Sequence, residues 1–409
     1  MSNQQKLNLH IPEPVARPGM AADFSNLVFP SAGETRRPDP LGDEIDMRDM
    51  NFELVRVLDE AGRAVGPWVP EISAARLRQG LRAMVLTRLF DDRMHRLQRQ
   101  GKTSFYMRST GEEAIGVAPS MVLEASDMCF PTYRVVGWLH ARRYPLLDMV
   151  NQLFSNAQDP LKGRQLPILY SARAYGFYSL SGNLGNRFGH AVGWAMASAY
   201  KNDDKIALAY IGEGSTAEGN FHEALTFASV YHAPCILCVC NNQWAISSYS
   251  GLAGGDETTF AAKALAYGIP GLRVDGNDFL AVWSATAWAA ERARANKGPT
   301  LIEFFTYRAA PHSSSDDPTK YRPADEAALW PLGDPITRLR QYLVNLGEWD
   351  ELRDEAMVAE LETEIQTALR QGEEIGALGQ SKPPVREMFE GVFKEPDWRV
   401  TEQRRELGV

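Results

Sequence analysis

The sequence has only four cysteines in 409 residues, no long apolar run and no cluster of basic residues. Three cysteines, Cys235, Cys238 and Cys240, alternate within an apolar segment, so we interpret them as core thiols rather than as disulfides or metal ligands. No apolar stretch approaches the roughly 18 residues that cross a membrane, and the first residues lack a signal-peptide core. A net charge of −9 without basic runs argues against nucleic acid. We therefore expect a cytoplasmic protein that binds neither membrane nor nucleic acid.

Proline sets the beginning of the chain apart, because eight prolines among the first 70 residues exclude long helices there. Residues 54–65 fit a small hairpin. We predict three regions, which are a Pro-rich N-terminal arm (1–70), an α/β domain (71–345) and a charged, peripheral helical tail (346–409). An arm that wraps a partner subunit is favoured over a flexible leader by the apolar residues Phe24, Leu27, Val28 and Phe29.

The segment from 206 to 247 organises the α/β region. Apolar runs at 206–211 and 235–240 predict two buried strands. Between them, Phe221, Ala224, Leu225 and Ala228 recur at helical spacing. Two more strands are predicted at 272–274 and 300–305, joined by a helix over 279–295, and a long helix precedes them all at 73–100. Strands that alternate with helices predict a doubly wound parallel sheet with helices on both faces.

Polar residues follow the predicted strands where ligands bind in such sheets. Glu213 lies between two glycines after the first strand, and Asn241-Asn242 follow the second. A carboxylate and an amide are hard oxygen ligands, suited to Mg²⁺ or Ca²⁺ that bridges a phosphate group. We expect a helix that begins near Thr216 to direct its free N–H groups at the same place. The segment therefore predicts a metal-bridged phosphate site.

Two further segments carry candidate chemistry. Tyr133-Arg134 lie in a turn-like context, and an arginine beside a phosphate can make a bidentate contact. His312 follows the last predicted strand among serines, aspartates and arginines, which makes it a candidate for proton transfer near neutral pH. Taken alone, both would more often be structural residues than functional ones.

The spacing of these motifs resembles a known family. Gly-Glu-Gly followed after 26 residues by Asn-Asn is similar to the thiamine diphosphate signature, and the His312 loop resembles that of the E1 α subunits of 2-oxo acid dehydrogenase complexes. The resemblance covers about residues 75–345. The motifs FYMRSTGEEAIG, LKGRQLP, NNQWAIS, RVDGNDF and HSSSDDPTKYR look closest to the branched-chain form, and the Pro-rich opening and the closing RRELGV resemble its bacterial version.

The resemblance implies particular roles for individual residues. It implies metal binding by Glu213, the Asn242 amide oxygen and the Trp244 carbonyl. It makes His312 the catalytic residue that passes an acyl group to a lipoyl arm. It implies cofactor contacts by Phe105, Tyr133, Arg134, Gly182, Leu184, Gly212, Glu213, Gly214, Ser215, Asn242 and His312. The sequence departs from the family pattern at three places. Glu213 stands where the family commonly has Asp, and Cys240 stands where animal relatives have a diphosphate-binding arginine. Asn186 and Arg187 occupy positions whose residues help to hold a potassium ion in animal relatives. We therefore expect no potassium ion here.

The activity implied is oxidative decarboxylation of branched 2-oxo acids with thiamine diphosphate and Mg²⁺, followed by acyl transfer to the lipoyl-bearing E2 core. This chain carries one half of a cofactor site, so the resemblance implies a β subunit in an α2β2 assembly. The alternatives are a pyruvate or acetoin dehydrogenase α subunit and, from another class, a non-catalytic assembly subunit. A nicotinamide-binding enzyme is disfavoured because Gly212, Gly214 and Gly219 do not have the Gly-x-Gly-x-x-Gly spacing.

Overall fold

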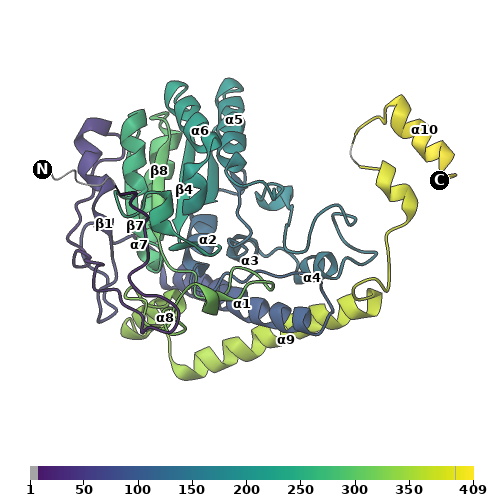
Figure 1. Cartoon of the computed structure of the whole chain (residues 1–409), viewed down its shortest axis with the longest axis horizontal. Helices are drawn as coiled ribbons and strands as arrows, with labels where there is room; N and C mark the ends of the chain where they lie inside the picture. The colour runs from purple at the N-terminus through teal and green to yellow at the C-terminus, as the bar shows by residue number, and fades with distance from the viewer. Residues whose placement is uncertain (1–7, 392) are drawn as a thin grey trace, which may run out of the picture.

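A six-stranded parallel sheet forms the centre of the computed structural model, which describes residues 8–391 and 393–409 (Figure 1). The strand order is β1-β7-β8-β4-β3-β2. The strands are β1 (Leu54–Val55), β2 (Met128–Phe130), β3 (Ala207–Gly212), β4 (Cys235–Asn241), β7 (Gly271–Asp275) and β8 (Thr300–Phe305). A short antiparallel pair is formed by β5 (Trp244–Ala245) and β6 (Ser248–Tyr249). The four strands predicted from the sequence, β3, β4, β7 and β8, are confirmed.

Helices cover both faces of the sheet, as predicted. Along β3, Ala207, Ala209 and Ile211 face one core, which they share with α5 (Asn186–Tyr200) and α6 (Gly219–Val230). Leu208 and Tyr210 face the opposite core, where α2 (Glu113–Val122) and α7 (Phe279–Arg294) pack. Side chains alternate along a strand, so one apolar run serves two layers. The four cysteines are buried and unpaired, which confirms their interpretation as core thiols.

The remaining helices, apart from α10, extend the second layer. They are α1 (Ala74–Arg99), α3 (Gly137–Ala141), α4 (Leu146–Phe154), α8 (Pro335–Asn345), α9 (Glu351–Ile375) and α10 (Trp398–Glu406). The Ser73 hydroxyl caps α1, and Gly101 follows it at φ +74°. The α9 helix packs on α1 and α4 through Leu361, Ile365 and Leu369, so one side of this C-terminal helix is part of the core. Figure 1 shows α10 standing apart from the sheet.

None of the helices in the described part of the chain is both long enough and apolar enough to span a membrane.

The N-terminal residues pack on this chain itself. Phe24, Leu27 and Phe29 join a cluster with Trp330, whereas Val28 is 87% exposed. Three of the four apolar residues are therefore buried within the chain, Val28 remains exposed, and the partner-wrapping arm stays a prediction. The predicted hairpin is reduced to an antiparallel bridge between Leu58 and Ala64, because Leu54 and Val55 instead form the edge strand β1 beside β7. The division of the chain at residues 70 and 345 stays a prediction.

Candidate active site

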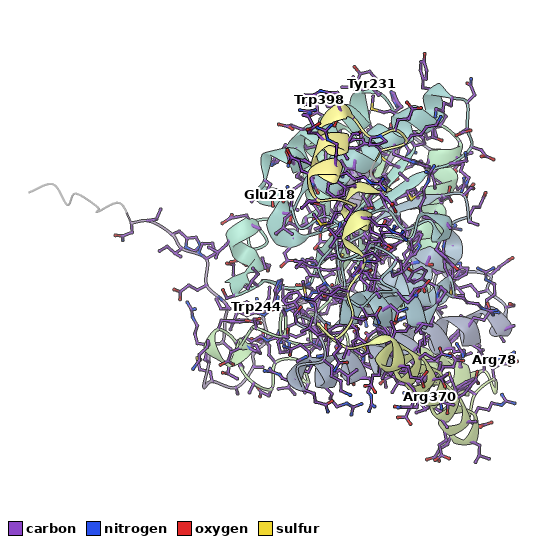
Figure 2. All side chains as sticks on the ribbon, turned by 90° about the vertical axis from the view of Figure 1, so that its right-hand side faces the viewer. Arg78, Glu218, Tyr231, Trp244, Arg370 and Trp398 are labelled. Atoms are coloured by element: carbon purple, nitrogen blue, oxygen red, sulfur yellow. The ribbon has the colours of Figure 1, made fainter. Side chains whose placement is uncertain are left out.

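A cavity of about 500 Å³ opens at the carboxyl ends of β3, β4 and β8. Figure 2 labels two of its lining residues, Glu218 and Trp244, on the same side of the molecule. Apart from Phe105, every predicted site residue lines it, namely Tyr133, Arg134, Gly182, Leu184, Gly212, Glu213, Gly214, Ser215, Asn242, Trp244 and His312. Residues that are far apart in the sequence thus meet at one edge of the sheet, because parallel strands end together there.

Glu213 presents a buried carboxylate to this cavity. The residue is 1% exposed, and its Oε2 accepts a hydrogen bond from the Asn242 N–H at 3.4 Å. Its Oε1 is buried and has no partner among the described residues. Burial, with the nearby Glu112 charge, raises the pKa of Glu213 to about 7. An orphaned carboxylate oxygen is costly in a folded protein, and a bound cation would remove that cost.

The turn that carries Glu213 differs from the predicted helix start. Glu213–Ala217 form a 3₁₀ helix, and α6 begins only at Gly219 rather than near Thr216. The helix N-terminus therefore lies three residues later in the chain than predicted. Gly214 packs so closely that a Cβ there would lie 2.6 Å from the Ala245 Cβ, which explains why the turn requires glycine at this position.

Asn242 is oriented by a residue that sequence reasoning did not assign to the site. The Asn242 Nδ2 donates to Glu112 Oε1 at 2.9 Å, and Glu112 is 1% exposed. The amide oxygen accepts from the Trp244 N–H at 3.3 Å. Glu112 thereby accepts one N–H of the Asn242 amide and fixes which end of the amide is the oxygen, and this oxygen and Glu213 Oε1 belong to residues that line the same cavity. Both are hard oxygen donors, so these residues fit Mg²⁺.

The Trp244 carbonyl, the third predicted metal ligand, already accepts from Arg308 Nη1 at 2.7 Å. A carbonyl has two lone pairs, so one remains for a cation. No group of three or more acidic, histidine or cysteine side chains suited to a metal occurs in the described ranges. The site therefore suits an ion that takes its other ligands from water and phosphate, as Mg²⁺ does.

Three buried arginines line the cavity, of which only Arg134 was predicted. Arg134 lies 3.6 Å from Glu112 and donates to the carbonyls of Arg108 and His312. Arg308 is fully buried and holds the Trp244 and Ile246 carbonyls. Arg187 of α5 is 3% exposed. Since arginine stays charged, this edge of the sheet is strongly electropositive and suits a phosphorylated ligand. Apart from the positions of Arg187 and Arg308 near the predicted loops, the sequence contains no signal that these two arginines are buried.

His312 is held between two of these arginines. Its Nδ1 lies 3.1 Å from Arg134 Nη2 and 3.5 Å from Arg308 Nη1. Arginine can only donate, so Nδ1 must be the acceptor and Nε2 carries the proton. Burial and the two positive charges lower the pKa of His312 to about 3. In this arrangement a neutral imidazole offers one N–H as a donor, and proton transfer by His312 near neutral pH stays a prediction.

Phe105 lies outside the cavity, and its neighbour Tyr106 has the structural role. Phe105 is partly buried against the main core. Tyr106 is fully buried, donates from its hydroxyl to Asp91 at 2.7 Å and accepts at its carbonyl from the Ser314 N–H at 2.8 Å. Ser314 follows His312 by two residues, so this segment anchors the loop that carries His312 without lining the cavity.

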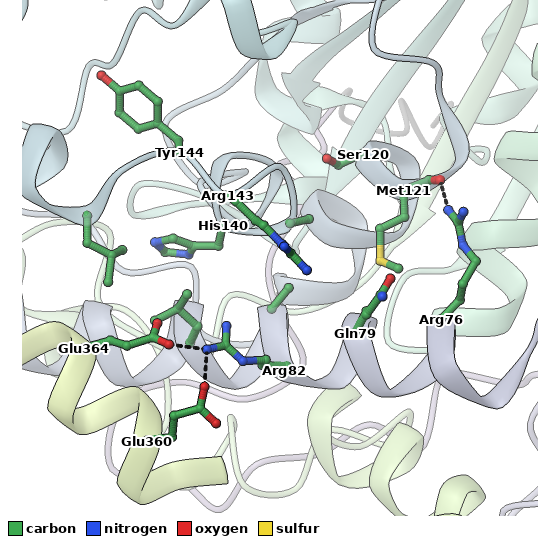
Figure 3. Close-up of a pocket in the computed structure, with 14 residues that line it drawn as sticks. Arg76, Gln79, Arg82, Ser120, Met121, His140, Arg143, Tyr144, Glu360 and Glu364 are labelled. Carbon is green, nitrogen blue, oxygen red and sulfur yellow. Dashed lines mark hydrogen bonds and ion pairs between the residues drawn. The ribbon is translucent and has the colours of Figure 1, made fainter.

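A second cavity, of about 700 Å³, lies between α1, α3 and α9 and contains none of the predicted residues (Figure 3). Arg82 pairs there with Glu360 at 3.0 Å and with Glu364, and Arg76 donates to the Met121 carbonyl. Its charged groups thus largely satisfy one another where α9 packs on α1. Glu213 Oε1 and Arg187 Nε, which are buried without a partner among the described residues, belong to residues of the sheet-edge cavity instead.

The parallel sheet, the Gly-Glu-Gly turn and the paired amides at its carboxyl edge define a thiamine diphosphate-dependent enzyme. The chain belongs to the dehydrogenase E1 component family, whose model matches residues 81–380. A second family model, described as the N-terminal part of the 2-oxoisovalerate dehydrogenase E1 α subunit, matches residues 5–41.

Individual relatives narrow the comparison. The chain is 55% identical over 410 residues to a 2-oxoisovalerate dehydrogenase subunit alpha of Pseudomonas aeruginosa, and the match covers 100% of both chains. It is 37% identical to the mitochondrial 2-oxoisovalerate dehydrogenase subunit alpha of Mus musculus, over 87% of this chain and 79% of that one. A pyruvate dehydrogenase E1 component subunit alpha of Staphylococcus aureus is 36% identical, over 86% of this chain and 92% of its own.

Proposed function

We propose that this chain is the α subunit of the E1 component of a branched-chain 2-oxo acid dehydrogenase complex, acting on the 2-oxo acids of valine, leucine and isoleucine. The observation that carries the proposal is the sheet-edge cavity, where the free oxygen of Glu213 lies among three buried arginines. Full-length identity of 55% to a 2-oxoisovalerate dehydrogenase subunit favours branched substrates. The 36% identity to a pyruvate dehydrogenase subunit makes pyruvate the second candidate substrate.

The lining residues divide into a metal-binding and a cofactor-binding set. Glu213 Oε1, the Asn242 amide oxygen and the Trp244 carbonyl would hold Mg²⁺. The diphosphate would lie against Arg134, Tyr133 and the backbone of Gly212–Ser215, and the aminopyrimidine against Gly182 and Leu184. We leave Phe105 out of this set because it does not line the cavity. Thiamine diphosphate, when bound, supplies the electron sink for decarboxylation.

This chain's own residues orient the reactants. Arg134 and Arg308 fix the imidazole of His312 through Nδ1, so that its Nε2 proton is available to a substrate oxygen or to the incoming lipoyl group. Two cations beside the ring keep it neutral in the free protein. The two contacts at Nδ1 fix which ring nitrogen carries the proton, which suits the ring to a hydrogen-bonding role in acyl transfer.

A β subunit would complete the site, and a lipoyl-bearing E2 core would receive the acyl group. Leu184, Ile246 and Leu252 line the cavity and are 44%, 51% and 55% exposed, respectively. Apolar side chains clustered at the rim of a polar cavity are typical of a surface that a partner covers. A partner there would exclude water from the reaction. We propose a cytoplasmic location for the complex.

Reconstitution with the cognate β chain tests the proposal. The pair should bind Mg²⁺ and thiamine diphosphate and should turn over 3-methyl-2-oxobutanoate with a higher kcat/KM than pyruvate. A higher kcat/KM for pyruvate would make the chain a pyruvate dehydrogenase subunit. Failure of the pair to bind the cofactor would instead indicate a non-catalytic assembly subunit.

A further inference from the structure

Arg187 differs from the other two arginines of the cavity in how its charge is satisfied. Its guanidinium has one hydrogen-bond partner among the described residues, the Ser181 carbonyl, which accepts from Nη2. Its Nε is buried without a partner, and no carboxylate of the described chain lies within ion-pair distance. Arg134, by contrast, is paired with Glu112, and Arg308 uses both terminal nitrogens on neighbouring groups.

An uncompensated buried arginine is unfavourable unless it has a ligand. Arg187 is 3% exposed, and burial lowers the pKa of its guanidinium while Tyr133, Glu218 and Cys240 act in the opposite direction. The guanidinium stays protonated nevertheless, since arginine is not deprotonated in proteins. Removing a charge from water without a counterion is unfavourable, and an anion in the cavity would offset that cost.

The position of Arg187 identifies which part of the cavity such an anion occupies. Arg187 is the second residue of α5, so the positive end of the helix dipole adds to its charge. Cys240, one of its electrostatic neighbours, is paired with Gly212 across β4 and β3. Gly212 begins the turn that carries Glu213. Arg187 therefore lines the same cavity as Gly212 and Glu213, where the metal and the phosphate would bind.

We propose that Arg187 is a further anion-binding residue of this cavity and donates to the diphosphate group of the bound cofactor. The inference rests on the proposed function, because it takes thiamine diphosphate as the occupant. With Arg134 bound to Glu112, Arg187 is the arginine whose donors are free to form charge-assisted hydrogen bonds to phosphate oxygens. Through Ser181 it also connects the phosphate end to the loop that carries Gly182 and Leu184.

The test measures binding to the α/β pair with two probes, Mg²⁺ with thiamine diphosphate and Mg²⁺ with inorganic pyrophosphate. Arg187→Gln should weaken both by roughly tenfold to a hundredfold, the range for a lost hydrogen bond to a charged group. Arg187→Met, which keeps the packing of the side-chain stem, should do the same if the glutamine variant does not fold. Arg143→Gln, which removes an exposed arginine outside this cavity, is the charge-matched control and should bind both probes like the wild type.

Three outcomes separate this inference from its rivals. Loss of thiamine diphosphate affinity with unchanged pyrophosphate affinity would mean that Arg187 only supports the loop at Ser181, and would overturn the proposal. Unchanged affinity for both probes with a raised KM for the 2-oxo acid would assign Arg187 to the substrate carboxylate and would also overturn it. A wild-type pair that binds no thiamine diphosphate would instead refute the proposed function.

Discussion

Replacing Glu213 with glutamine should raise the stability of the chain relative to the wild type at neutral pH and should lower its affinity for the cofactor. Burial raises the pKa of this carboxyl from its ordinary value of 4.5 to about 7. Between these two pH values the unfolded chain releases the proton more readily than the folded chain, so the folded state loses stability as pH rises. Above pH 7 the carboxyl is ionised in both states, so its unfavourable contribution to the free energy of unfolding no longer changes with pH. A shift of about 2.5 pH units corresponds to about 3 kcal/mol.

Glutamine cannot ionise, so the Glu213→Gln variant should lack this loss. Without metal or cofactor, the free energy of unfolding of the wild type should fall by up to about 3 kcal/mol more than that of the variant between pH 5 and pH 8. The same substitution removes the anionic metal ligand. Affinity for thiamine diphosphate in the presence of Mg²⁺ should therefore fall by about a hundredfold or more.

Two measurements test the burial of the Glu213 carboxylate and its role as a metal ligand. Urea unfolding at pH 5, 6, 7 and 8 gives the stability difference, and fluorescence titration with the β chain present gives the cofactor affinity. Glu355→Gln, on the exposed side of α9, controls for the loss of one charge. Parallel stability profiles of wild type and Glu213→Gln, together with unchanged cofactor affinity, would refute both the burial argument and the metal assignment.

Three further substitutions test other parts of the molecule. His312→Ala should reduce lipoyl-dependent turnover about a hundredfold or more while decarboxylation with an artificial electron acceptor survives better, and equal small losses in both assays would contradict the role in acyl transfer. Asp278→Ala removes the cap of α7 and the 3.3 Å ion pair with Arg338. Urea unfolding should therefore show that the free energy of unfolding falls by about 3 kcal/mol or more. An unchanged unfolding midpoint would show that Asp278 does not stabilise the fold. Gly66→Ala should lower Tm, because Gly66 has φ +85° and its Cβ would lie 2.2 Å from the Gly33 Cα, and a wild-type Tm would show that the loop adjusts freely.

The sequence predicted the parts of the fold that rest on continuous apolar runs. Strands β3 and β4 were predictable because both of their faces are buried, and Glu213 and Asn242 follow directly from where these strands end. The edge strand β1 was not, since two residues carry no periodicity. The packing of α9 was missed because its apolar stripe is diluted by charged residues.

The sequence was sufficient to predict that Glu213 and Asn242 line the cavity, but not that further charged residues are buried around them. Glu112, Arg187 and Arg308 are all buried, although charged residues are expected on surfaces. Their burial depends on which loops meet at the sheet edge, and no local pattern encodes that. The pKa of His312 could not be anticipated either, because it is determined by Arg134 and Arg308 from distant segments.

The edge strand β1 has a consequence for the order in which the chain can fold. The backbone N–H of Val57, just after β1, donates to the Asp278 carboxylate 221 residues later. At roughly 5–20 residues per second of synthesis, these N-terminal residues wait on the order of ten seconds or more before β7 emerges from the ribosome. Contacts of such long range form slowly. During that interval Leu54 and Val55 lack their partner strand β7, and Trp68 lacks Trp288, so these apolar side chains stay incompletely covered until β7 and α7 have been made.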